Sequence, residues 1–145
     1  MNIRRFAMWS GVLMLAIGII SLIPNLSQSS ATLPALKLDT SYGLFLGLFA
    51  MNIMNKAALI AFGFWGMMAA RAPSLNSPIT FSRTVAIVMG AAAVLGLIPQ
   101  TRTFFGYWPL FGAEVVMHAA FAALGTYFGF AMAPREVARR AHSAM

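Results

Sequence analysis

Residues 6–24 read FAMWSGVLMLAIGIISLIP, and this stretch decides the fold because it runs for 19 positions without a charged side chain. At a rise of about 1.5 Å per residue, about 20 apolar residues cross the hydrocarbon core of a bilayer as a helix. Proline cannot donate the next helical hydrogen bond, so the helix is expected to end at Pro24. The stretch therefore predicts a membrane-spanning helix over residues 6–24.

Three further stretches have the same character. They run over residues 42–70, 84–99 and 111–133 and are rich in Leu, Ile, Ala, Met and Phe. None shows the strict alternation of apolar and polar positions that a membrane β-barrel needs. Helices satisfy their own backbone hydrogen bonds in lipid. The sequence thus predicts an all-α integral membrane four-helix bundle, with residues 1–145 forming one membrane domain.

The composition of the whole chain agrees with a membrane protein. Hydrophobic residues make up 60% of the 145 positions and charged residues 9%, whereas soluble domains hold about 45–50% and about 25%. This balance excludes a soluble cytosolic enzyme and a disordered tail. The chain has no cysteine, which excludes a disulfide scaffold, a Cys-ligated zinc site and an iron–sulfur cluster.

The basic residues predict the orientation. Seven flank the chain ends and the middle connection, whereas Lys37 and Arg102 lie in the other two connections; the seven are Arg4, Arg5, Arg71, Arg83, Arg135, Arg139 and Arg140. By the positive-inside rule, both termini and the middle connection are expected in the cytoplasm. The net charge of +7 is then expected to favour contact with anionic lipid headgroups. The basic tail over residues 134–145 is expected to lie on the inner leaflet. Nucleic-acid binding is not expected, because the charge is split into short flanks.

Two features indicate an internal repeat. Leu22-Ile23-Pro24 recurs 75 positions later as Leu97-Ile98-Pro99, and Leu48-Phe49 recurs 62 positions later as Leu110-Phe111. The chain is therefore predicted to consist of two tandem helical hairpins in the same orientation. The repeat also argues against the alternative that the first span is a signal peptide cleaved near residues 30–31.

Four polar residues interrupt the second and fourth spans: Asn52, Lys56, Glu114 and His118. The offset of 62 relates the first pair to the second, and each pair is spaced i, i+4 on one helical face. Polar groups in hydrocarbon are costly, so they are expected to face the bundle interior and to pair. We expect an ion pair between Lys56 and Glu114 near the outer leaflet, completed by Asn52 and His118. A purely structural network and a ligand, ion or proton site both remain open for this cluster.

Other site chemistry is not indicated. Met117 and His118 are adjacent and point about 100° apart on a helix, so they cannot bind one haem iron from the same side, and the other histidine, His142, is in the tail. The chain has no clustered metal ligands, no nucleophilic triad and no phosphate-binding loop. The sequence therefore predicts a protein that is not an enzyme and has no metal and no cofactor.

Four motifs resemble those of a known bacterial family. They are YGLFLGLFAMN at residues 42–52, GAAAVLGLIP at residues 90–99, GAEVVMH at residues 112–118 and YFGF at residues 127–130. They resemble the Leu-Phe-x-x-Asn, Gly-Leu-Ile-Pro and Gly-Asn-Asp-Val-x-x-His elements of the small four-helix membrane proteins called domain of unknown function 4383. The resemblance covers about Arg5 to Arg135 and implies a fold without an established activity.

The chain also departs from that family. Where the family has a His-Asn-x-x-His run, this chain has Asn55, Lys56 and Leu59, and Ala113-Glu114 replaces Asn-Asp. The departures put any histidine chemistry of the family, such as metal binding, in doubt for this member, and the lysine favours an ion pair or a protein contact instead.

The predicted function is that of a non-enzymatic accessory or structural subunit that packs against a larger bacterial membrane complex, respiratory or photosynthetic. The alternative is a small transporter or ion or proton conduit that uses Lys56, Glu114 and His118. A third possibility is a redox or quinone-handling membrane enzyme. Each function predicts a different observation. An accessory subunit co-purifies with a defined partner in mild detergent, a transporter or conduit produces a flux in vesicles, and a redox enzyme carries a bound coloured cofactor.

Overall fold

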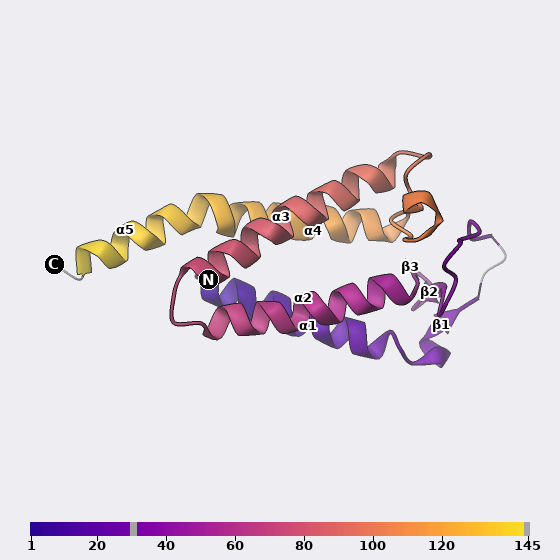
Figure 1. The fold of residues 1–145 in the computed structure, drawn as a ribbon, viewed down its shortest axis with the longest axis horizontal. Helices are drawn as coiled ribbons and strands as arrows, with labels where there is room; N and C mark the ends of the chain where they lie inside the picture. The colour runs from indigo at the N-terminus through magenta and orange to yellow at the C-terminus, as the bar shows by residue number, and fades with distance from the viewer. Residues whose placement is uncertain (30–31, 144–145) are drawn as a thin grey trace.

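The computed structural model describes residues 1–29 and 32–143, and these residues are mostly helical (Figure 1). The candidate spans are α1 (Ile3–Ile20), α2 (Ile53–Arg71), α3 (Asn76–Leu97) and the continuous helix that α4 (Ala113–Thr126) begins. Each is long and apolar enough to cross a membrane. The prediction of a helical, multi-pass membrane protein is therefore confirmed. The cleavage site considered near residues 30–31 and the last two residues of the tail lie outside the described part of the chain.

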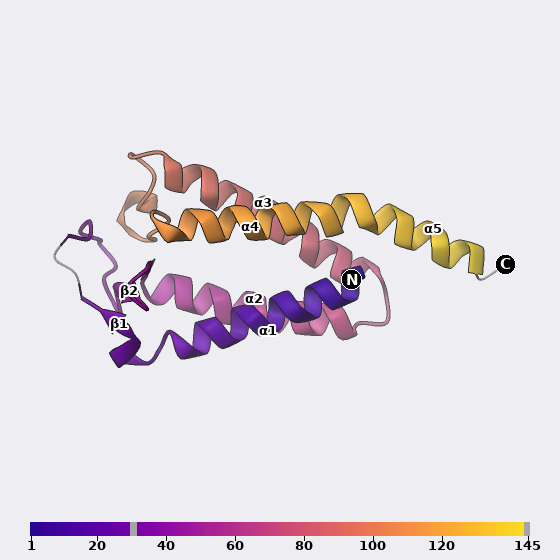
Figure 2. The same cartoon turned by 180° about the vertical axis from the view of Figure 1, so that it is seen from behind.

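The fourth helix continues into the tail. After α4 the chain forms a π-helical segment, η3 (Tyr127–Met132), and then α5 (Ala133–Ser143), which extends α4 in nearly the same direction (Figure 2). The Arg83 Nε donates to the carbonyl of Gly129 at 2.9 Å, and the guanidinium lies over the Phe130 ring. Arg83 thereby stabilises the turn at which the helix widens.

The helices pack as two antiparallel pairs, α1 with α2 and α3 with α4. Small residues let the backbones approach closely. A Cβ at Gly63 of α2 would lie 2.6 Å from the backbone nitrogen of Leu15, and a Cβ at Gly125 would lie 2.7 Å from that of Ala86. Gly63 and Gly125 thus lie where the two backbones of each pair approach closely, and Gly11 of α1 has a similarly close approach to the backbone of α2.

The N-terminus and the connection between α2 and α3 lie at one end of the molecule, which we call the terminal end (Figure 1). The buried core sits here, where Phe6 stacks on Phe128 at 4.6 Å and Trp65 meets Phe81 edge to face at 5.4 Å. The opposite end, the loop end, is formed by residues 21–29, 32–52 and 98–112. The two pairs are held together mainly at the terminal end.

The loop end contains a small antiparallel sheet of order β1-β2-β3, with β1 at Ser27–Gln28, β2 at Gly43–Phe45 and β3 at Phe49–Met51. Short 3-10 turns, Pro24–Leu26 and Phe104–Gly106, complete this end. The prediction that the second span starts at residue 42 is therefore wrong, because residues 43–51 form a β-hairpin. Leu46 and Gly47 turn with φ of 52° and 72°, which no helix allows.

The third helix starts earlier than the predicted residue 84. α3 begins at Asn76, whose amide donates a hydrogen bond to Ser74 Oγ at 3.0 Å. Pro78 lies in the first turn, where a missing backbone donor costs nothing. Residues 76–83 include several polar side chains, so hydropathy alone did not predict these two turns of helix.

Two charged side chains tie the helix ends together at the terminal end. The Arg4 guanidinium donates to the carbonyls of Ala70, Ala72 and Pro73, which satisfies the free acceptors at the end of α2. The buried Glu136 of α5 accepts from the amide of Ile3 at 3.2 Å, at the positive end of α1. The beginning of α5 is therefore joined to the start of α1.

Replacing Glu136 with alanine is expected to destabilise the protein by about 1–3 kcal/mol, because the Ile3 amide loses its acceptor in a buried place. Thermal unfolding in detergent, followed by circular dichroism, measures the change. Asp39→Ala, which removes the same charge from an exposed position, is the control and is expected to leave the unfolding temperature unchanged. Equal effects of the two variants would contradict a capping role for Glu136.

Candidate polar site at the loop end

The four predicted polar residues all lie at the loop end. Asn52 is the N-cap of α2 and Lys56 is in the first turn of that helix. Glu114 and His118 occupy the first two turns of α4. The structure thus places the four residues at one end of the molecule, but it divides them into two groups with different surroundings.

Asn52 holds the two loops of this end onto α2. Its side chain is fully buried, and its Oδ1 accepts from the amide of Met54 at 3.0 Å. Its Nδ2 donates to the carbonyl of Leu38 at 2.9 Å and to that of Tyr107 at 2.8 Å. One side chain therefore caps a helix and joins segments that are 55 and 14 positions away in the sequence.

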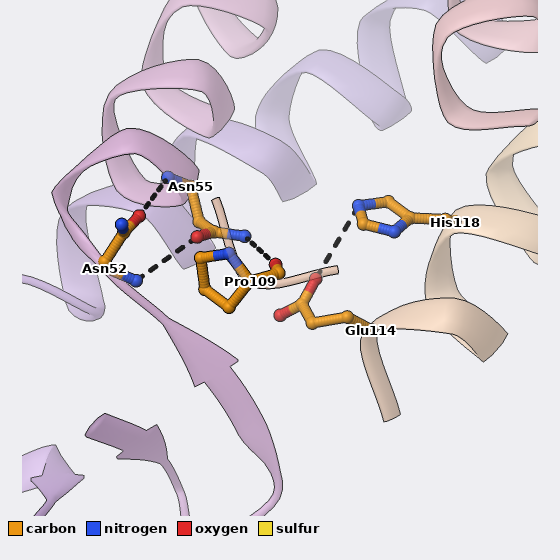
Figure 3. Close-up of polar contacts among 5 residues, drawn as sticks. All are labelled: Asn52, Asn55, Pro109, Glu114 and His118. Carbon is orange, nitrogen blue, oxygen red and sulfur yellow. Dashed lines mark hydrogen bonds and ion pairs between the residues drawn. The ribbon is translucent and has the colours of Figure 1, made fainter. Parts of the chain in front are cut away.

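Asn55 belongs to the same network and was not predicted. Its Oδ1 accepts from the amide of Asn52 at 3.2 Å, which completes a capping box, and its Nδ2 donates to the carbonyl of Pro109 at 3.2 Å (Figure 3). The signal for it was in the sequence: a polar residue three positions after a good N-cap residue is a pattern of helix starts.

Further contacts join the two loops. The amides of Lys37 and Leu38 donate to the carbonyl of Gly106 at 2.7 Å and 3.2 Å. The Tyr42 hydroxyl donates to the carbonyl of Pro34 at 3.1 Å, and burial raises the pKa of this tyrosine above its usual value. The loops are thus a hydrogen-bonded layer over the end of the helices.

Lys56 does not form the predicted ion pair with Glu114. The side chain is 1% exposed, and its Nζ donates to the carbonyl of Ser41 at 3.0 Å and to Ser41 Oγ at 2.6 Å. The segment that leads into the β-hairpin brings Ser41 within reach of the amine, so Lys56 finds its partners in the loop. The alternative function of an ion or proton conduit assumed that Lys56, Glu114 and His118 act together, and Lys56 is instead bonded to the loop.

Glu114 and His118 form the second group. Glu114 Oε2 lies 3.7 Å from His118 Nε2 on the next turn of α4 (Figure 3). Glu114 is 5% exposed, yet among residues 1–29 and 32–143 its Oε1 has no hydrogen-bond partner, and neither has His118 Nδ1. Trp108 was not among the predicted site residues, and its indole nitrogen also has no partner within the described part of the chain. Within the described residues, these three buried polar atoms and Ser27 Oγ of β1 have no hydrogen-bond partner at this end.

These three side chains line one cavity of about 460 Å³ between the two helix pairs. Asn55 also reaches its wall, and the other lining residues are apolar. Met117 and Phe121 separate this cavity from a smaller one of about 290 Å³ that lies against α1. Within residues 1–29 and 32–143, no three His, Asp or Glu side chains gather as a metal site requires.

Four apolar helices and a polar cluster at one end define a small helical membrane protein. The chain belongs to the family described as Domain of unknown function (DUF4383), whose model matches residues 4–131. The resemblance inferred from the motifs is therefore confirmed. Neither the curated proteins nor the solved structures contain a match to the chain.

Proposed function

We propose that the protein is a non-enzymatic accessory subunit that packs against a larger complex, respiratory or photosynthetic, in a bacterial inner membrane. One observation carries the proposal, the exposure of the fourth span. Only 17% of its most apolar window is buried, against 33–44% for the other three spans. The fourth span is the least covered by the protein's own helices.

The composition of its exposed face supports a helical partner. Ala119, Ala120 and Ala123 are exposed on α4, and Ala120 also borders the smaller cavity against α1. Lipid tails would accept any apolar side chain there, whereas small residues spaced i, i+4 let another helix approach closely. This face therefore fits a partner helix from another membrane protein.

The proposal includes the orientation and the repeat. Arg4 and Arg71 lie together at the terminal end, where Arg4 binds the end of α2. A cytoplasmic terminal end would place them against anionic headgroups. Gly63 and Gly125 are separated by the repeat offset of 62, and each lies where the two helices of its pair approach closely. This correspondence supports duplication of one hairpin.

Extraction of the native protein in mild detergent tests the proposal. A defined larger membrane complex is expected to co-purify with the wild-type protein. Ala123→Phe is expected to reduce the amount of complex recovered by about tenfold, because the ring prevents the close approach of the partner helix. A tenfold change corresponds to about 1.4 kcal/mol of binding free energy. Ala61→Phe, at an exposed alanine of α2, is the control. Isolation only as a monomer or homo-oligomer, or unchanged recovery with Ala123→Phe, would contradict the accessory role.

A further inference from the structure

The cavity between the helix pairs has the dimensions of a small-molecule site. Its volume of about 460 Å³ falls in the range of roughly 300–1,000 Å³ that is common for ligand pockets. Its walls come from both pairs, because α2 contributes Ala58 and Phe62 whereas α3 and α4 contribute Ala92 and Phe121. A ligand there would fill the space where the pairs do not touch.

The polar atoms at its wall are of three kinds. Trp108 Nε1 is a donor, His118 Nδ1 is a donor or an acceptor, and Glu114 Oε1 is an acceptor or, when protonated, a donor. A buried polar atom without a partner costs about 1–3 kcal/mol. An occupant with hydrogen-bonding groups at this wall would recover that cost, and a plain hydrocarbon chain would not.

The apolar part of the wall is rich in rings. Six aromatic residues line the cavity, in a chain that is 12% aromatic: Phe45, Phe49, Phe62, Phe104, Trp108 and Phe121. Aromatic side chains stack on flat rings in offset or edge-to-face arrangements. The lining therefore favours an occupant with a planar ring over one with only a flexible chain.

We propose that this cavity binds a lipid-soluble compound whose planar ring carries carbonyl or hydroxyl groups, the chemistry of quinones and quinols. The ring packs among the aromatic side chains. A ring carbonyl accepts from Trp108 or His118, and a ring hydroxyl donates to Glu114. This binding activity goes beyond the accessory role and does not depend on the partner complex.

The experiment uses the full chain in detergent and a benzoquinone that carries a decyl chain. Equilibrium dialysis against protein-free micelles of the same detergent measures the bound quinone. Wild-type protein is expected to bind it saturably. Ala58→Phe, which fills the cavity, is expected to weaken binding by about tenfold or more, whereas Ala57→Phe on the neighbouring exposed alanine is expected to bind as wild type does.

A second pair of variants tests the hydrogen bonds without filling the cavity. Trp108→Phe keeps an aromatic ring but removes the Nε1 donor and is expected to weaken binding several-fold. Trp9→Phe, at an exposed tryptophan, is expected to change nothing. Circular dichroism shows whether Ala58→Phe folds. If it does not fold, the comparison of Trp108→Phe with Trp9→Phe tests quinone binding in the cavity.

Three outcomes would overturn the proposal. The first is quinone uptake that does not saturate and equals that of empty micelles. The second is displacement of the quinone by an equal concentration of monoolein, which has hydroxyl groups but no ring and would identify the occupant as a membrane lipid. The third is equal binding by both members of a variant pair.

Discussion

Replacing Gly63 with alanine is expected to separate α1 from α2 and to lower the free energy of unfolding by about 1–3 kcal/mol or more. The new Cβ would lie 2.6 Å from the backbone nitrogen of Leu15 and 2.7 Å from its Cα. Backbone atoms cannot rotate away as the end of a long side chain can. The helices must therefore move apart along the pair, and the contacts of their neighbours weaken with them.

Thermal unfolding in detergent measures this effect, and Gly90→Ala provides a matched control on α3. A Cβ at Gly90 would meet its nearest neighbour, the Cβ of Ala122, at an ordinary 3.8 Å. Alanine is favoured over glycine in a helix by about 1 kcal/mol, so Gly90→Ala is expected to raise the unfolding temperature or leave it unchanged. Opposite signs for the two variants are the expected result. A Gly63→Ala protein as stable as Gly90→Ala would show that the α1–α2 distance is not set by this glycine.

The number and place of the helices could be predicted because length and apolarity decide whether a segment crosses a bilayer. The first span was expected over residues 6–24 with its end at Pro24, but α1 runs over Ile3–Ile20 and Pro24 begins a separate 3-10 turn. The start of the second span could not be found this way. Residues 43–51 are as apolar as a helix, and only the left-handed turn at Leu46 and Gly47, a matter of backbone conformation, makes them a hairpin.

The candidate site was predictable in its location but not in its pairing. The repeat gave Asn52 and Glu114 corresponding positions within the second and fourth spans, and the structure shows that both lie at helix starts at the loop end. The partner of Lys56 depends on the path of the loop, and Ser41 reaches the amine only after the hairpin has formed. The sequence did not mark Trp108 or Ser41 as site residues, because their roles in the site arise from contacts between separate segments of the chain.

Replacing Asn52 with leucine is expected to lower the free energy of unfolding by about 3 kcal/mol or more, because several buried groups lose partners that are each worth about 1–3 kcal/mol. The amide of Met54 loses its acceptor, and the carbonyls of Leu38 and Tyr107 lose their donors. Asn25→Leu, at an exposed position of the same end, is the control. Thermal unfolding in detergent measures stability, and limited proteolysis reports how well the loops are held.

Asn52→Asp separates the two roles of this residue. Aspartate is as good an N-cap as asparagine, so the acceptor for Met54 is kept, but the donors to Leu38 and Tyr107 are lost. The expected stability lies between those of wild type and Asn52→Leu, with faster cleavage of the loops. Wild-type behaviour of Asn52→Asp would show that the loop carbonyls need no donor from α2. Since Asn55 also donates to the loop, at Pro109, the double variant with Asn55→Leu is expected to release the loops further, because both amide donors from α2 are then absent.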